Sequence, residues 1–218
     1  MCGRYVSPEQ AAIERAWRIH RSSGLDFPRR FNVQPTTDVP LLFLDSGELV
    51  LEAARWGLIP HWWKQERPPT FTINARLEEA AGKPMWRDPM RHARCLLPAE
   101  GWYEWQEVAG GKQPHYIRRT DGKLFCFAGL MSLWKDRLSC AILTRPAAGP
   151  LAGVFERMPV VLPDEAHSGW LDPALKDASA YARERALSRE FTHYAVSKRV
   201  NSARNEGADL IEPLTSQP

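Results

Sequence analysis

Short extended segments separated by turn residues are the feature that most constrains the fold of this chain. Two pairs of such segments flank the turn sequences Asp45-Ser46-Gly47-Glu48 and Thr120-Asp121-Gly122-Lys123, and each pair predicts a β-hairpin. Repeated turn signals between short runs favour a fold rich in antiparallel sheet. The runs expected to be extended are residues 41–44, 49–53, 115–119, 124–130, 139–144, 154–162 and 193–196.

Two helices are expected beside these strands. Ser7 is a good N-cap, Pro8 suits the first helical position, and Gln10 completes a capping box. Asp172 followed by Pro173 predicts a second helix that runs to about residue 188. The chain has 218 residues and neither an internal repeat nor a long linker. We therefore predict a mixed α+β fold in one domain, residues 1–218, whose last few residues form a disordered tail.

The charge balance is mild and the cysteines are scattered. The net charge is +3 with 25% charged residues, which permits nucleic-acid binding without demanding it. The cysteines at positions 2, 95, 126 and 140 form no CxxC pair that would indicate a metal site. The sequence has no apolar signal segment and no apolar run of about 18 residues. We expect a cytoplasmic protein with reduced thiols, no metal and no small-molecule cofactor.

Cys2 has the most distinctive chemistry in the chain. Removal of Met1 would leave Cys2 as the N-terminal residue, with an amine and a thiol on adjacent carbons. Such a 1,2-aminothiol captures aldehydes, because the amine forms an imine and the thiol then closes a five-membered thiazolidine. Position alone is a weak indication, since a cysteine at position 2 is more often an ordinary buried or frayed residue.

Asn74 and Arg76 are candidate groups for holding a nucleotide. They lie two residues apart on a short β-like run, so both side chains face the same side. An amide and a guanidinium on one face can hold a sugar and a phosphate. The alternative is an asparagine cap beside a solvated arginine.

Two aromatic stretches offer a base-stacking surface and an acid–base group. Trp62 and Trp63 stand on a loop with basic neighbours, where they either stack on bases or are partly buried under the loop. Glu104 lies between Tyr103 and Trp105, and aromatic surroundings raise the pKa of a carboxyl toward the range useful in general acid–base catalysis. The alternative is simple alternation, with both aromatic side chains inward and Glu104 outward in water.

These segments, in their order along the chain, resemble the SOS-response-associated peptidase (SRAP) family, whose members bind abasic sites in DNA. Any one segment is a weak match, whereas the ordered set from residue 2 to residue 213 is specific. The matching segments are Met1-Cys2-Gly3-Arg4-Tyr5, Asn32-Val33-Gln34-Pro35, Trp56-Gly57-Leu58-Ile59-Pro60, Ile73-Asn74-Ala75-Arg76, residues 94–105, Arg157-Met158-Pro159, residues 196–201, Arg204-Asn205-Glu206-Gly207 and Leu210-Ile211-Glu212-Pro213.

The resemblance implies a fold and a reaction. The fold is a single SRAP domain with mixed, largely antiparallel sheets in a barrel-like core flanked by helices. Family members lose Met1 by their own peptidase action, and Cys2 then reacts through lyase-like Schiff-base chemistry with the ring-opened aldehyde of an abasic site. The product is a thiazolidine crosslink to single-stranded DNA that shields the lesion in the DNA damage response. A monomer is sufficient for this chemistry.

The resemblance also implies residue roles. Cys2 is the reacting residue, Asn74 helps to hold the sugar or the developing ring, and Glu104 acts as acid or base in ring opening and imine formation. The residues similar to the family's DNA contacts are Arg4, Arg76 and Arg157 for phosphates, Trp62 for packing against DNA, and Thr144 for lining the site.

One departure from the family pattern concerns Phe155. The family has at this position a histidine that is thought to assist proton transfer around the ring-opened sugar, and phenylalanine carries no titratable group. The hypothesis is slower crosslinking, or altered reversal, with Glu104 working alone. Phe155→His should then crosslink faster, and equal rates would refute the idea. His61, His92 and His115 are candidates to take over the missing role.

Two other functions stay open from the sequence. Cys2 could be the N-terminal nucleophile of a peptidase or amidase, with its own amine as the base. The chain could also be a module that binds single-stranded DNA without chemistry, since it lacks the expected histidine. Formation of a covalent adduct with abasic single-stranded DNA distinguishes both from the crosslinking function.

Overall fold

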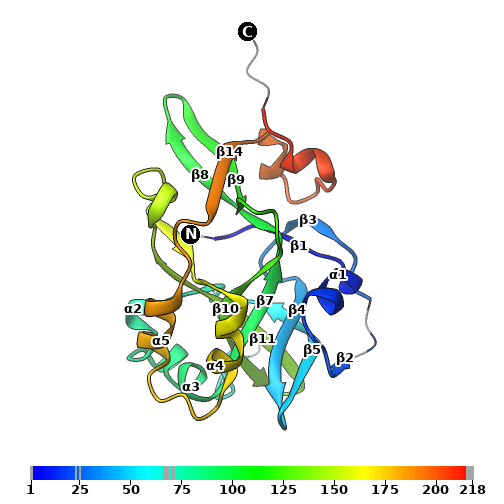
Figure 1. Ribbon diagram of the computed structural model, residues 1–218, viewed down its shortest axis with the longest axis vertical. Helices are drawn as coiled ribbons and strands as arrows, with labels where there is room; N and C mark the ends of the chain where they lie inside the picture. The colour runs from blue at the N-terminus through cyan, green and yellow to red at the C-terminus, as the bar shows by residue number, and fades with distance from the viewer. Residues whose placement is uncertain (1, 23, 25, 66–68, 70–71, 215–218) are drawn as a thin grey trace.

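The computed structural model describes residues 2–22, 24, 26–65, 69 and 72–214 (Figure 1). The sequence-based expectations for Met1 and for the tail at residues 215–218 lie outside this set.

A first sheet holds the N-terminal segment in place. Every pairing in it is antiparallel. Because β1 lies between β8 and β3, the chain that follows Cys2 is fixed by neighbours on both sides. In their order across the sheet the strands are β14 (Phe191–Ala195), β9 (Gly111–Arg119), β8 (Gly101–Val108), β1 (Tyr5–Ser7) and β3 (Arg30–Val33).

A second, larger sheet curves back on itself. Parallel pairing of β5 with β11 closes β11, β10, β7, β4 and β5 into a ring of strands, which corresponds to the expected barrel-like core. In order, its strands are β12 (Arg157–Pro159), β11 (Arg137–Pro146), β10 (Phe125–Trp134), β7 (Arg94–Ala99), β4 (Asp38–Asp45), β5 (Glu48–Trp56) and β2 (Arg21–Ser22); β13 (Val161–Leu162) pairs with β10, and β6 (Asn74–Arg76) pairs with β11. The predicted mixed, largely antiparallel α+β fold is confirmed.

Short helices flank this ring. Figure 1 shows α2, α3, α4 and α5 gathered beside the second sheet, and the α1 segment packs in the same core cluster as these helices. No helix among the described residues is long and apolar enough to cross a membrane. The helices are α1 (Gln10–Ala16), α2 (Leu77–Ala80), α3 (Pro84–His92), α4 (His167–Leu171) and α5 (Ala178–Arg185), with 3₁₀ turns η1 (Gly149–Leu151), η2 (Asp164–Ala166), η3 (Lys198–Asn201) and η4 (Ala208–Ile211).

The core that matters for the site is the aromatic cluster shared by the two sheets. Tyr5 of β1 meets Trp56 of β5 edge-on, with ring centroids 5.4 Å apart, and Trp102 of β8 meets Phe127 of β10 at 6.1 Å. All four side chains are fully buried. Each such side chain contributes roughly 1.5–3 kcal/mol of burial free energy, so the sheets are firmly joined where Cys2 enters.

Both predicted helix starts are wrong. Ser7 belongs to β1, where it pairs with Arg30, so it does not cap a helix. The first helix begins only at Gln10 and has no side-chain cap. Asp172 follows α4, and the cap of α5 is Asp177, whose carboxylate accepts from a backbone N–H at 2.8 Å.

One predicted hairpin is confirmed and the other is wrong. β4 and β5 pair across the turn at Ser46 and Gly47 as expected. The strands on either side of residues 120–123 do not pair with each other: β9 pairs with β8 and β14, whereas β10 pairs with β7 and β11. The chain crosses from the first sheet to the second at this turn, which local turn chemistry does not reveal.

Candidate active site

Cys2 lies in the core between the two sheets, with its side chain fully buried. The side-chain amide of Asn74 donates from Nδ2 to the carbonyl oxygen of Cys2 at 2.8 Å. Burial raises the pKa of the Cys2 thiol well above its ordinary value, and the nearby charge of Glu104 raises that pKa further. The thiol is therefore protonated near neutral pH, and a base must take its proton before the sulfur can attack.

Glu104 points inward, which overturns the alternation expected as the simpler possibility. Its exposed fraction is 6%, while its neighbour Tyr103 is also fully buried and Trp105 is half-buried. The cause is that the first half of β8 is covered on both faces, so that burial does not alternate there. Burial raises the pKa of the Glu104 carboxyl above its ordinary value, as the aromatic surroundings predicted.

Asn74 presents a further polar atom to the site. β6 pairs in parallel with β11, and the burial of Ala75 leaves Asn74 and Arg76 on the opposite side of the strand, as predicted. Among the described residues, Asn74 Oδ1 is buried and has no hydrogen-bond partner. Buried acceptors are nearly always satisfied in folded proteins, so this oxygen is available to a donor on a ligand.

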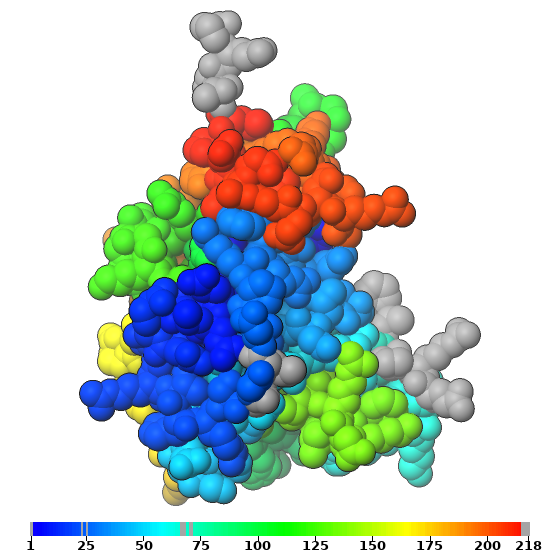
Figure 2. All heavy atoms as spheres, turned by 90° about the vertical axis from the view of Figure 1, so that its right-hand side faces the viewer, coloured from blue at the N-terminus to red at the C-terminus, as the bar shows by residue number. Residues whose placement is uncertain are grey.

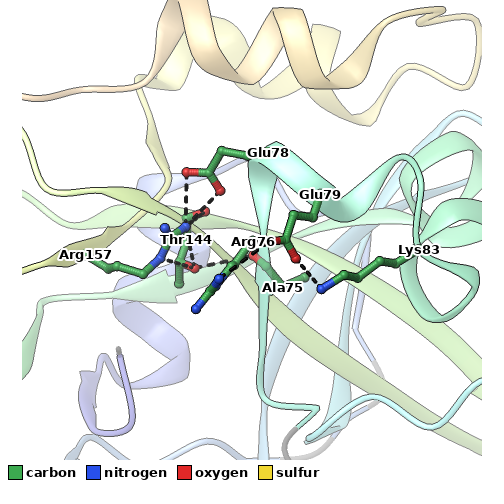
Figure 3. Close-up of polar contacts among 7 residues, drawn as sticks. All are labelled: Ala75, Arg76, Glu78, Glu79, Lys83, Thr144 and Arg157. Carbon is green, nitrogen blue, oxygen red and sulfur yellow. Dashed lines mark hydrogen bonds and ion pairs between the residues drawn. The ribbon is translucent and has the colours of Figure 1, made fainter.

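Figure 3 shows the structure bringing Thr144, Arg157 and Arg76 together. Thr144 pairs with Arg76 across β11 and β6, and its buried hydroxyl accepts from Arg157 Nε at 3.3 Å. Arg157 Nη2 also lies 2.9 Å from the carboxylate of Glu78. Arg76 is exposed and lies 3.5 Å from Glu79. Thr144 therefore holds Arg157 in place, and each guanidinium has a carboxylate beside it.

The guanidinium of Arg4 makes hydrogen bonds within the protein. Its Nη1 atom donates to Asn32 Oδ1 at 2.8 Å and to the carbonyl oxygen of Val200 at 3.1 Å. Asn32, which the sequence did not mark as a site residue, donates in turn to the carbonyl oxygens of Ser202 at 3.0 Å and Asn205 at 2.9 Å. Figure 2 shows the C-terminal segment, in orange and red, lying against the blue N-terminal part of the chain. This arginine ties that segment to β1 and β3.

Trp62 is exposed, with 44% of its surface accessible. Its ring centroid lies 6.1 Å from that of Trp63, which is half-buried. Both indoles are therefore partly covered, Trp63 more than Trp62, as the alternative expected. An exposed indole is a surface on which a base can stack.

Phe155 lies beside a pair of histidines that sequence reasoning did not bring together. Its ring contacts that of His115 at 5.8 Å and that of His193 at 5.6 Å between centroids. Phe155 and Glu104 line one cavity of about 370 Å³. His61 and His92 are exposed. In the part of the chain that the structure describes, no group of three or more His, Cys, Asp or Glu side chains is arranged to hold a metal ion.

The fold and site define a mixed α+β protein in which Cys2 is a buried cysteine beside an amide and a carboxyl of raised pKa. Residues 1–203 match the family model of the SOS response associated peptidase (SRAP). The chain belongs to this family.

Named relatives and a solved structure agree with this assignment. The chain is 35% identical to "Abasic site processing protein YedK" of Escherichia coli (strain K12), over 98% of this chain and 100% of that protein. It is 34% identical to "Abasic site processing protein YoqW" of Bacillus subtilis (strain 168), over 97% of this chain and 99% of that protein. A crystal structure of a Bacteroides thetaiotaomicron protein matches with a TM-score of 0.82 at 24% identity, covering 98% of this chain and all of that one, and supports the fold.

Proposed function

We propose that this protein processes abasic sites in single-stranded DNA by covalent capture on Cys2, after removal of Met1. Family membership and the names of its relatives support abasic-site processing. The observation that carries the covalent step is the 2.8 Å hydrogen bond from Asn74 to the carbonyl oxygen of Cys2. It holds the cysteine backbone beside Glu104, whose charge acts on the thiol.

The reaction balances without a cofactor. The ring-opened abasic sugar presents an aldehyde, and the Cys2 amine adds to it to give a carbinolamine. Loss of water gives the imine, and the thiol sulfur then bonds to the same carbon and closes the thiazolidine. The two amine protons leave with the aldehyde oxygen as water, and the thiol proton ends on the ring nitrogen. An acid must protonate the departing hydroxyl and a base must receive the thiol proton.

Glu104 is suited to both proton transfers. Burial keeps more of its carboxyl protonated near neutral pH than in an ordinary glutamate, so it can donate to the leaving hydroxyl. Once ionised, the same carboxylate can accept the thiol proton. The peptidase step that removes Met1 would use the same sulfur as nucleophile, so one arrangement of residues serves both reactions.

Backbone contacts and stacking would recognise the DNA, because an abasic sugar offers no base edge. Arg76 and Trp62 are exposed and can meet a phosphate and a base. Arg157 reaches a phosphate only in competition with Glu78. Arg4 acts through its hydrogen bonds to Asn32 and Val200, which fix the strand that follows Cys2.

The test is adduct formation with a single-stranded oligonucleotide that contains one abasic site, resolved by denaturing electrophoresis. Intact mass first establishes that Met1 has been removed. We expect a covalent adduct from the wild-type protein and none from Cys2→Ala, whereas Cys95→Ala, a buried cysteine elsewhere in the core, should still form it. Absence of an adduct from wild-type protein that lacks Met1 would overturn the proposal and favour a non-covalent binding module.

A further inference from the structure

His115 and His193 form a hydrogen-bonded pair near the candidate active site. The Nδ1 atoms of the two rings are 3.1 Å apart and the ring centroids are 5.2 Å apart. The two residues come from β9 and β14, neighbouring strands of the first sheet. Both are half-buried, and the Phe155 ring contacts each of them in a T-shaped arrangement. Phe155 adds no titratable group to the pair.

The strand register places this pair in line with Glu104. In the pairing of β8 with β9, Glu104 stands directly opposite His115. Directly opposed side chains lie on the same face of a sheet. On the other side of β9, His193 pairs with Ile117, two residues from His115 and therefore on that face as well. Three titratable side chains thus form a row across β8, β9 and β14, and the charge of the first of them reaches the Cys2 thiol.

A contact between two Nδ1 atoms at this distance requires one proton between them. In the neutral pair one ring donates its Nδ1–H, which leaves its Nε2 as a bare acceptor, while the other ring carries Nε2–H. The pair can take up a single further proton, which gives Nε2–H on both rings. A second would set two Nδ1–H groups against each other and break the contact. The neutral pair can therefore accept one proton and no more.

The surroundings of His115 oppose the uptake of that proton on its ring. Burial lowers the pKa of His115, and the neighbouring charge of His193 lowers it further. The other charged group facing the cavity from the loop that carries Phe155 is Glu156. Farther along the β8–β9 hairpin, Lys112 is paired with Glu107 at 3.6 Å.

We propose that the His115–His193 pair is the second proton carrier of this site, which works with Glu104 where Phe155 supplies no titratable group. The inference rests on the proposed function. Loss of water from the carbinolamine needs an acid at the departing hydroxyl and a base at the nitrogen in the same step, and a single carboxyl cannot be both at once. Glu104 protonates the hydroxyl while the histidine pair accepts the nitrogen proton. When the sulfur then closes the ring, the ionised Glu104 takes the thiol proton and the pair returns its proton to the nitrogen, so Glu104 does not act alone.

The test measures single-turnover adduct formation across pH for wild-type protein, His115→Gln and His193→Gln. His92→Gln, at an exposed site on α3, is the matched control. We expect both pair variants to react at least about tenfold more slowly, since positioned acid–base groups contribute roughly 10²–10⁴-fold. Both should also lose the same ionisation from the pH–rate profile. Binding to an oligonucleotide with a tetrahydrofuran in place of the abasic sugar, which has no aldehyde, should not change.

A rescue variant separates proton transfer from a structural role. Phe155→His in the His115→Gln background restores a histidine beside His193 and should recover rate and ionisation, whereas Phe155→His alone should change the wild-type rate by less than about threefold. Pair variants that match His92→Gln, or that slow the reaction without altering the pH profile and without rescue, would overturn the relay. If thermal melting shows that one pair variant is unfolded, the other decides. Absence of any adduct from wild-type protein would instead overturn the proposed function.

Discussion

The side-chain amide of Asn74 donates to the carbonyl oxygen of Cys2 at 2.8 Å, although Asn74 lies in the second sheet and Cys2 precedes the strand β1 of the first. Asn74 stands on β6, which is paired to β11 of the ring, whereas Cys2 leads into β1 of the first sheet. The cysteine backbone is thus held at the junction of the sheets. This matters for the proposed reaction, because a residue near a chain terminus is otherwise too mobile for repeated attack from one direction.

Asn74→Ala should slow adduct formation more than it lowers stability. The variant removes one hydrogen bond, which contributes about 1 kcal/mol to the free energy of unfolding. It also releases the Cys2 backbone, and loss of positioning costs on the order of 10²-fold in rate. Adduct kinetics and urea unfolding measure the two effects. Asn205→Ala, which loses an exposed 2.7 Å side-chain hydrogen bond to Arg199, is the control, and an equal loss of rate there would contradict the positioning role.

Glu104→Gln should stabilise the fold while it slows the reaction. Burial raises the pKa of Glu104 above its ordinary 4.5, so the native state keeps a proton that the unfolded state has already released. Wild-type stability therefore falls as the pH rises from about 4.5 through the higher native pKa, and the loss is constant above it. Glutamine does not titrate. Near pH 4 the variant and the wild type should therefore be equally stable. Above the native pKa the free energy of unfolding of the variant should exceed that of the wild type by about 1.4 kcal/mol for each unit by which the pKa is raised.

Thermal melting across this pH range, together with adduct kinetics, tests that expectation. The control is Glu107→Gln on the same strand, where the side chain is 84% exposed and no such pH dependence is expected. A Glu104→Gln protein that is less stable than wild type above neutral pH would show that the ionised carboxylate is well compensated in the fold.

Asn32→Ala should loosen the C-terminal segment. Asn32 accepts from Arg4 and donates to the carbonyl oxygens of Ser202 and Asn205, so its removal takes away three partly buried hydrogen bonds. Each such hydrogen bond contributes about 1 kcal/mol to the free energy of unfolding. We expect a clear fall in melting temperature and faster proteolysis within residues 198–214. Asn201→Ala removes a single exposed hydrogen bond to Trp105 and should do neither.

The sequence predicts features whose causes are local. Asn74 and Arg76 share a side because side chains alternate on any strand, and β4 and β5 pair because a two-residue turn joins them. The burial of Glu104 could not be predicted from alternation along its strand, because whether a strand has one solvated face depends on the sheet that packs against it. The contact between His115 and His193 joins residues 78 positions apart, on strands whose pairing no turn sequence specifies.

Glu78→Gln should strengthen the binding of single-stranded DNA. The Arg157 side chain is only 14% exposed and lies 2.9 Å from Glu78, so the carboxylate competes with any phosphate that approaches the guanidinium. Without that negative charge, Arg157 can make one more phosphate contact, which steepens the dependence of log Kd on log salt by about 0.7. Titration of an oligonucleotide that carries tetrahydrofuran, at several salt concentrations, measures this slope. Glu184→Gln removes an exposed charge beside Arg185 and serves as the control, and a slope that changes equally in both variants would mean that Arg157 does not meet the DNA.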